Sequence, residues 1–158
     1  MGANNTQRTM IYTDLQTDRM LAALDQVSAQ TNSTQQTIEK DWWVTQVLRV
    51  LFSLPYAEHL SFKGGTSLSK AWNIIERFSE DIDIAISREY LGFVGELSRT
   101  QVSDKLRRAA CSFVRERMQN DLREGLIVLG IAPEKFNVYV NITSVSTTDP
   151  EVIYIDYE

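Results

Sequence analysis

Apolar residues recur every three or four positions in the first third of the chain, which is the spacing of one helix face. A first helix is predicted from about Asp14 to Ala29, after a polar leader. Its apolar stripe consists of Leu15, Met20, Leu21, Leu24 and Val27. Residues 31–34 then interrupt the pattern with types that favour turns and helix caps. Residues 1–34 are therefore expected to form a leader and one helix.

A second helix is predicted from about Gln35 to Leu54, where Pro55 stops it. One side of it is apolar, formed by Ile38, Trp42, Val47, Leu48 and Leu51. A charged cluster, Glu39 to Asp41, precedes two tryptophans. We interpret this cluster as a solvated helix face beside core aromatic residues.

The middle of the chain is predicted to form a strand, a glycine turn, a helix and a second strand. Leu60 to Lys63 is a short predicted strand that leads into Gly64 and Gly65. The helix after it spans about Thr66 to Glu76, with an apolar stripe formed by Leu68, Ala71, Trp72 and Ile75. A second strand is predicted from Ile82 to Ser87, parallel or antiparallel to the first.

In the second half of the chain, the pattern of residues predicts one long helix and two strands. The helix runs from about Gln101 to Glu124 and is expected to end at Gly125. Its core face is Val102, Leu106, Ala109, Phe113 and Leu122, and its outer face carries Lys105, Arg107, Arg108, Arg115, Arg117 and Arg123. Alternating residues predict strands over 136–143 and 152–157. The order of elements indicates an α+β fold with a mixed sheet flanked by helices and an N-terminal helical pair.

Composition is that of one ordinary globular domain. The 158 residues are 43% hydrophobic and 23% charged, with a formal net charge of −5. That balance argues against a broadly basic surface that coats nucleic acid, although a local basic patch can still contact RNA. Cys111 is the only cysteine, so we expect it to be buried, and with His59 as the only histidine it cannot supply a zinc site. Without an apolar leader or a membrane-length apolar run, a cytoplasmic protein is expected.

The glycine turn is the first candidate site. Two glycines let backbone N–H groups approach a ligand, and a helix that starts at Thr66 directs its unpaired N–H groups toward phosphate. Lys70 lies just over one turn into that helix, from where its side chain can reach back. The alternative is that the glycine pair forms an ordinary left-handed turn that binds no ligand.

Two acidic residues form the second candidate site. On a strand Asp81 and Asp83 point to one side, while Ile82, Ile84 and Ile86 point to the other. Paired carboxylates near a phosphate cradle suit Mg²⁺. Two solvated acids at a strand edge are the alternative. Together with the glycine turn, the pair indicates metal-assisted nucleotide transfer.

Three ordered motifs carry a family resemblance. They are Ile38 to Val44, Phe62 to Ala71 and Glu76 to Asp83. Gly64-Gly65 followed by Asp81-Ile82-Asp83 resembles the signature of polymerase-β-type nucleotidyltransferases. The three motifs together resemble the AbiEii/AbiGii (MenA-like) nucleotidyltransferase toxins of abortive-infection and toxin–antitoxin systems, over about residues 35–158.

The resemblance implies a role for each matching residue. Gly64, Gly65 and Thr66 would hold the nucleoside triphosphate, with phosphate contacts from Lys70, Arg77 and Ser79. Asp81 and Asp83 would bind Mg²⁺ and act as the catalytic carboxylates. The implied reaction transfers NMP from NTP to an RNA acceptor, with tRNA 3′ ends as the best-supported class, and a cognate antitoxin is the implied partner.

The main departure from the family pattern concerns the third carboxylate, which such sites usually take from a later strand. In the relatives it lies on a strand after the one that Ile153 to Tyr157 resembles, so residues 35–158 are expected to be an N-terminal portion of a longer core. Asp156 has a strand setting that could substitute. The alternative function is a catalytically incomplete fragment that binds partners or oligomerises through its C-terminal strand edge. A kinase-like NTP hydrolase is disfavoured, because the chain has no G-x-x-x-x-G-K-[ST] loop.

Overall fold

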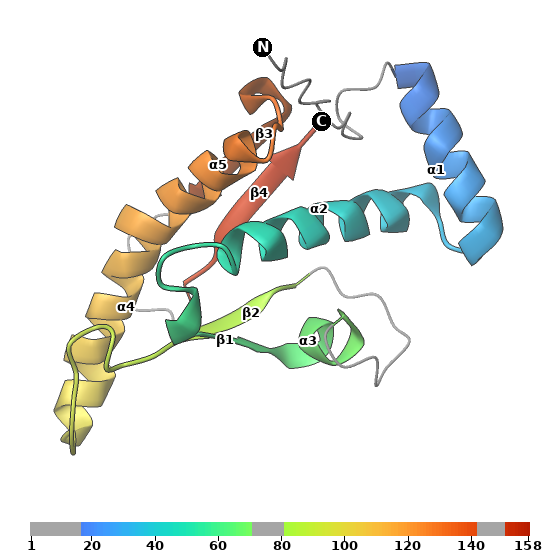
Figure 1. Cartoon of the computed structure of the whole chain (residues 1–158). Helices are drawn as coiled ribbons and strands as arrows, with labels where there is room; N and C mark the ends of the chain where they lie inside the picture. The colour runs from blue at the N-terminus through green and yellow to red at the C-terminus, as the bar shows by residue number, and fades with distance from the viewer. Residues whose placement is uncertain (1–16, 71–80, 142–150) are drawn as a thin grey trace, which may run out of the picture.

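The computed structural model describes residues 17–70, 81–141 and 151–158. Helices and strands follow one another as the sequence predicts, and Figure 1 shows their arrangement. The first part contains α1 (Thr17–Thr31), α2 (Gln35–Leu51), η2 (Ala57–His59), β1 (Leu60–Lys63), α3 (Gly64–Lys70) and β2 (Asp83–Ile86). The second part contains η3 (Gln101–Leu106), α4 (Arg107–Phe113), η4 (Val114–Met118), α5 (Gln119–Val128), η5 (Pro133–Lys135), β3 (Phe136–Val140) and β4 (Ile153–Tyr157).

The α+β class is confirmed, and the strand pairing that the sequence left open is antiparallel. Within the described residues the strands form two separate two-stranded sheets in place of one sheet. In the first, β1 pairs with β2, with Lys63 opposite Asp83. In the second, β3 pairs with β4, with Phe136 opposite Tyr157. Burial alternates along β4 as predicted, with Tyr154 and Asp156 on its exposed face.

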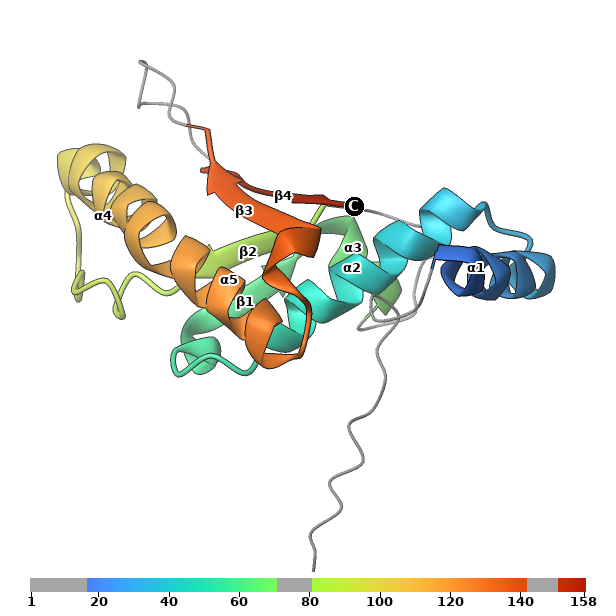
Figure 2. The ribbon, with the colours of Figure 1, turned by 90° about the horizontal axis from the view of Figure 1, so that it is seen from above.

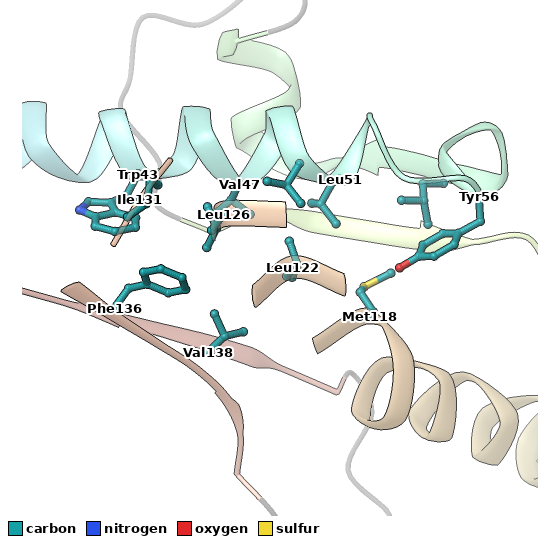
Figure 3. Close-up of a cluster of buried hydrophobic side chains, with 12 residues drawn as sticks. Trp43, Val47, Leu51, Tyr56, Met118, Leu122, Leu126, Ile131, Phe136 and Val138 are labelled. Atoms are coloured by element: carbon teal, nitrogen blue, oxygen red, sulfur yellow. The ribbon is translucent and has the colours of Figure 1, made fainter. Parts of the chain in front are cut away.

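The core forms where α2, α5 and β3 meet. Figure 3 shows Trp43, Val47 and Leu51 of α2 facing Phe136 and Val138 of β3, with Leu122 and Leu126 of α5 between them. The Trp43 ring also stacks on Tyr157, with ring centroids 4.7 Å apart. Trp43 and the residues one and two turns after it are thus the main contribution of α2 to the core. The core position predicted for the tryptophans is confirmed for Trp43, whereas Trp42 is only partly buried and packs against the core.

Local capping explains the corner between α1 and α2. Asn32 adopts a left-handed φ of 54°, a conformation that asparagine tolerates better than most residues. Thr34 then caps α2, because its hydroxyl accepts the backbone N–H of Thr37 at 3.2 Å. Helix α1 packs on α2 and extends away from the rest of the fold (Figure 2). Only part of its predicted stripe is covered, since Leu24 is buried while Leu21 and Val27 are exposed.

The long helix is one continuous helical segment over residues 101–128, with π-helical turns at η3 and η4. The prediction that it ends at Gly125 is wrong. It ends at Val128, and Gly130, with a φ of 96°, follows the Leu129 cap in a Schellman motif. Gly130 N–H donates to the Ile127 carbonyl at 2.9 Å, and Ile131 N–H donates to the Leu126 carbonyl at 3.1 Å. Gly125 lies inside the helix because α5 approaches α2 there; a Cβ on Gly125 would lie 2.3 Å from Val50 Cγ1.

The two faces of the long helix differ in part from the prediction. Val102 is 47% exposed and lies outside the core, because the π-helical first turn belongs to an end of the helix that few residues cover. Cys111 is buried as expected. Arg115, assigned to the outer face, forms a bidentate ion pair with Glu151 just before β4. Among the described residues, no helix is long and apolar enough to cross a membrane.

Candidate functional site

The turn between β1 and α3 brings a glycine and a carboxylate into contact. Helix α3 begins at Gly64, directly after the last residue of β1, and Gly64 has a φ of 68°. Asp83 is the first residue of β2, opposite the residue that precedes Gly64. A Cβ on Gly64 would lie 1.8 Å from Asp83 Oδ2 and 2.8 Å from Asp83 Cγ. The Asp83 carboxylate therefore lies against the backbone of the glycine turn, a place that only glycine leaves open.

Thr66 ties the start of α3 to the approach to β2. Its side chain is fully buried, and its hydroxyl donates to the backbone carbonyl of Asp81. The neighbouring Ser67 is also buried. Because a buried hydroxyl that donates to a carbonyl has a fixed direction, this bond holds the helix start and Asp81 in one arrangement.

Asp81 and Asp83 are both exposed and alternate with partly buried isoleucines. Ile82, Ile84 and Ile86 pack against the core, so the two carboxylates share the opposite side. Mg²⁺ commonly keeps several waters and binds one or two protein carboxylates together with substrate phosphates. The two acids beside an open glycine turn fit such an ion, although the described residues hold no group of three or more metal-ligating side chains.

Lys70 is held by α2. Its ammonium lies 2.7 Å from Asp41 Oδ1 and donates to Thr45 Oγ1 at 3.0 Å. Asp41 belongs to the charged cluster interpreted above as a solvated helix face. The Asp41 side chain is 46% exposed, in line with that interpretation, and it also forms the ion pair with Lys70, which the helical spacing of the cluster does not indicate.

A comparison with protein families adds to this geometry. The family model described as nucleotidyl transferase AbiEii toxin, type IV toxin–antitoxin system, matches residues 46–157. The chain belongs to the AbiEii family. The match covers the turn, both acids and Lys70, so the family resemblance noted in the sequence is confirmed. No curated protein matches the chain, and no solved structure does either.

Membership of the AbiEii family gives the coarse function: a nucleotidyl transfer enzyme that acts as a toxin, with nucleotide substrates and a cognate antitoxin. Two of the predicted AbiEii phosphate contacts, Arg77 and Ser79, lie outside the described residues, as does Trp72. Asp156 lies on β4 in the other sheet, where hydrogen bonding to its carboxylate raises the pKa of Tyr139. It forms no metal-ligating group of three with Asp81 and Asp83 in the part of the chain that the structure describes.

Sequence reasoning missed three polar residues around the AbiEii site. Asp41 and Thr45 contact Lys70, and Lys63 stands opposite Asp83 in the β1–β2 ladder. Directly opposed side chains on an antiparallel pair lie on the same face of the sheet. An antiparallel pairing of the two predicted strands, had it been assumed, would have placed Lys63 beside the acids. Asp41 lies within the family motif Ile38 to Val44, but that motif gave it no role, and Thr45 lies just outside the motif.

Proposed function

We propose that this protein is a Mg²⁺-dependent nucleotidyltransferase that transfers NMP from an NTP to an RNA acceptor, with tRNA 3′ ends as the preferred class. The contact between Gly64 and the Asp83 carboxylate carries the proposal. It brings a backbone suited to close approach by phosphate to within contact distance of a metal-binding acid, which is the arrangement that metal-assisted transfer needs. Membership of the AbiEii family supports the reaction class.

Each residue has a role in the proposed reaction. The backbone N–H groups of Gly64, Gly65 and Thr66 hold the triphosphate, with further contacts from Lys70, Arg77 and Ser79. Asp81 and Asp83 hold Mg²⁺, which when bound supplies charge neutralisation at the reacting phosphates. The acceptor hydroxyl loses its proton to water as its oxygen forms a bond to the α-phosphorus, and the bond from that phosphorus to the pyrophosphate oxygen breaks, so that pyrophosphate leaves.

The RNA contact is proposed for the exposed basic residues of the long helix. Lys105, Arg108 and Arg123 are exposed, so their charges are accessible to a phosphate backbone. Arg115 is less suited, because Glu151 occupies its guanidinium. Reversing both charges in Arg108→Glu/Arg123→Glu would weaken transfer to tRNA while leaving nucleotide binding intact. The cognate antitoxin is the proposed regulatory partner.

The proposal is tested by incubating the protein with each α-³²P-labelled NTP, Mg²⁺ and total tRNA. Transfer of label should fall by roughly 100-fold or more in Asp81→Asn and in Asp83→Asn, because each removes a carboxylate from the metal. Asp18→Asn, which removes an exposed acid from the first turn of α1, is the matched control and should retain transfer.

Other outcomes identify the alternatives. A wild-type protein that neither transfers label nor binds an NTP would contradict the proposal. If such a protein sedimented as a dimer or higher assembly, a binding or oligomerisation module that uses the C-terminal strand edge would be the better description. Phosphate release without labelled RNA would indicate an NTP hydrolase.

A further inference from the structure

Helix α3 is attached to the rest of the protein near both ends. Near its start, the Thr66 hydroxyl bonds to the Asp81 carbonyl. At its last described residue, Lys70 bonds to Asp41 and Thr45 of α2. We call Asp41, Thr45 and Lys70 the α2–α3 clamp. The glycine turn is therefore held from the strand side by one attachment and from the α2 side by the other.

The protons of the clamp can be assigned from its distances. Thr45 Oγ1 lies 2.8 Å from the backbone carbonyl of Asp41, an acceptor only, so the single hydroxyl proton is donated there. The lone pairs of the same oxygen then accept an N–H of Lys70. A second N–H of the ammonium faces Asp41 Oδ1. An ammonium has three N–H donors, and the contacts within the described residues use two of them.

The base of the clamp lies on a helix that packs in the core. Asp41 and Thr45 are four residues apart, so they lie on one face of α2. Other faces of the same helix bury Trp43, Val47 and Val50 in the core. The Lys70 side chain is 24% exposed, so its ammonium is partly shielded from water and its direction is set by the two α2 groups. A buried helix thus fixes the charge at the end of α3.

We propose that Asp41 and Thr45 are positioning residues for nucleotide binding, acting through Lys70. The clamp holds α3, and the Lys70 ammonium with it, in the one geometry in which the triphosphate is bound. Neither residue contacts the nucleotide. This inference rests on the proposed function and assigns residues that the family resemblance does not.

The test is a mutant cycle on nucleotide affinity. Dissociation constants are measured in the presence of Mg²⁺ for the α,β-methylene analogues of ATP, GTP, CTP and UTP, which bind without reacting at the α-phosphate. Asp41→Asn and Thr45→Val should each weaken the analogue that binds wild type best by about 5–20-fold, as expected for members of one hydrogen-bonded network. Lys70→Met should weaken it at least as much.

The double variant and the rescue separate positioning from general stability. Asp41→Asn/Lys70→Met should bind no more weakly than Lys70→Met alone, because Asp41 acts only through the lysine. Thr45→Ser keeps the hydroxyl and should restore most of the affinity. Glu39→Gln removes a charge two residues from Asp41, on a different side of α2, and should bind like wild type. Melting temperatures should change little, since the Asp41 side chain of the pair is 46% exposed.

The inference is overturned if Asp41→Asn binds with wild-type affinity, or if the Asp41 and Lys70 effects multiply in the double variant. It is also overturned if affinity falls only in proportion to melting temperature, which would make the clamp purely structural. A wild-type protein that binds none of the four analogues contradicts the proposed function itself, and the wild-type measurement alone identifies that case.

Discussion

Replacing Gly64 with alanine tests the central contact of the site. The new methyl group would lie 1.8 Å from Asp83 Oδ2, whereas ordinary contacts of this kind begin at about 3.4 Å. The Asp83 side chain is exposed and can turn away. The carboxylate must therefore move by about 1.5 Å, and Asp83 Cβ, at 3.1 Å, must move by a few tenths of an ångström.

The substitution has two effects, backbone strain at residue 64 and displacement of the Asp83 carboxylate, and they differ in size. Left-handed backbone at a φ of 68° costs an alanine about 1–2 kcal/mol, which in a domain of this length lowers the melting temperature by roughly 2–8 °C. Displacing the carboxylate that is proposed to hold Mg²⁺ by more than 1 Å is expected to reduce transfer by about 100-fold or more. We therefore expect Gly64→Ala to remain folded and to lose nucleotide transfer.

Gly95→Ala is the matched control. Gly95 has a φ of 78°, and among the described residues no heavy atom lies within 4 Å of its Cβ position. The control shares the backbone strain and lacks the clash, so both variants should melt at similar temperatures while only Gly64→Ala loses transfer. Calorimetry and the labelled-tRNA assay measure the two effects. Wild-type transfer by Gly64→Ala would refute the reasoning, and equal losses in both variants would assign the effect to backbone strain.

Two other regions give further predictions. Gly125→Ala should lower the melting temperature, because overpacking against Val50 costs about 1–3 kcal/mol and outweighs a helix-propensity gain of about 1 kcal/mol; in a Val50→Ala background the same change should raise it. Arg115→Ala should cost about 1–3 kcal/mol in urea unfolding at pH 7, because it leaves the nearly buried Glu151 carboxylate without its partner. Hydrogen bonding to Arg115 holds the pKa of Glu151 below its ordinary value of 4.5. The Arg115–Glu151 pair thus stabilises the fold fully above about pH 4.5, and this contribution is lost as the pH falls through the lowered pKa of Glu151. Glu151→Gln should remove this part of the pH dependence of stability.

Most helices and strands could be predicted from local sequence patterns. The predictions failed where a contact between residues far apart in the chain decides the structure. The span Leu60–Lys63 is a strand as predicted, because its alternation and the glycine after it are local signals. Gly125 looked like a helix end for the same local reason. Its absent side chain instead makes room for Val50, seventy-five residues earlier in the chain, and that contact leaves no local trace.

The candidate site divides in the same way. The glycine turn and the two acids were visible because their residue types and spacing carry chemistry, and the structure places Asp83 against Gly64. Asp41 lies in a family motif, but sequence reasoning assigned it no role in the site. Its neighbours on α2 have the composition of any solvated face, and the carboxylate gains its partner only because the Lys70 side chain of α3 reaches it.

Helix α2 links the core to the site, and its residues should separate into two groups by the property they control. Val47 and Val50 are buried in the core, so their substitution should lower stability first and activity only through unfolding. Asp41 and Thr45 contact Lys70 of α3, the helix that is proposed to bind the nucleotide, so their substitution should lower nucleotide affinity in a protein that stays folded. The two groups should differ because α2 directs Val47 and Val50 to the core and directs Asp41 and Thr45 to Lys70. If substitutions in both groups lowered stability and affinity alike, this reasoning would be contradicted.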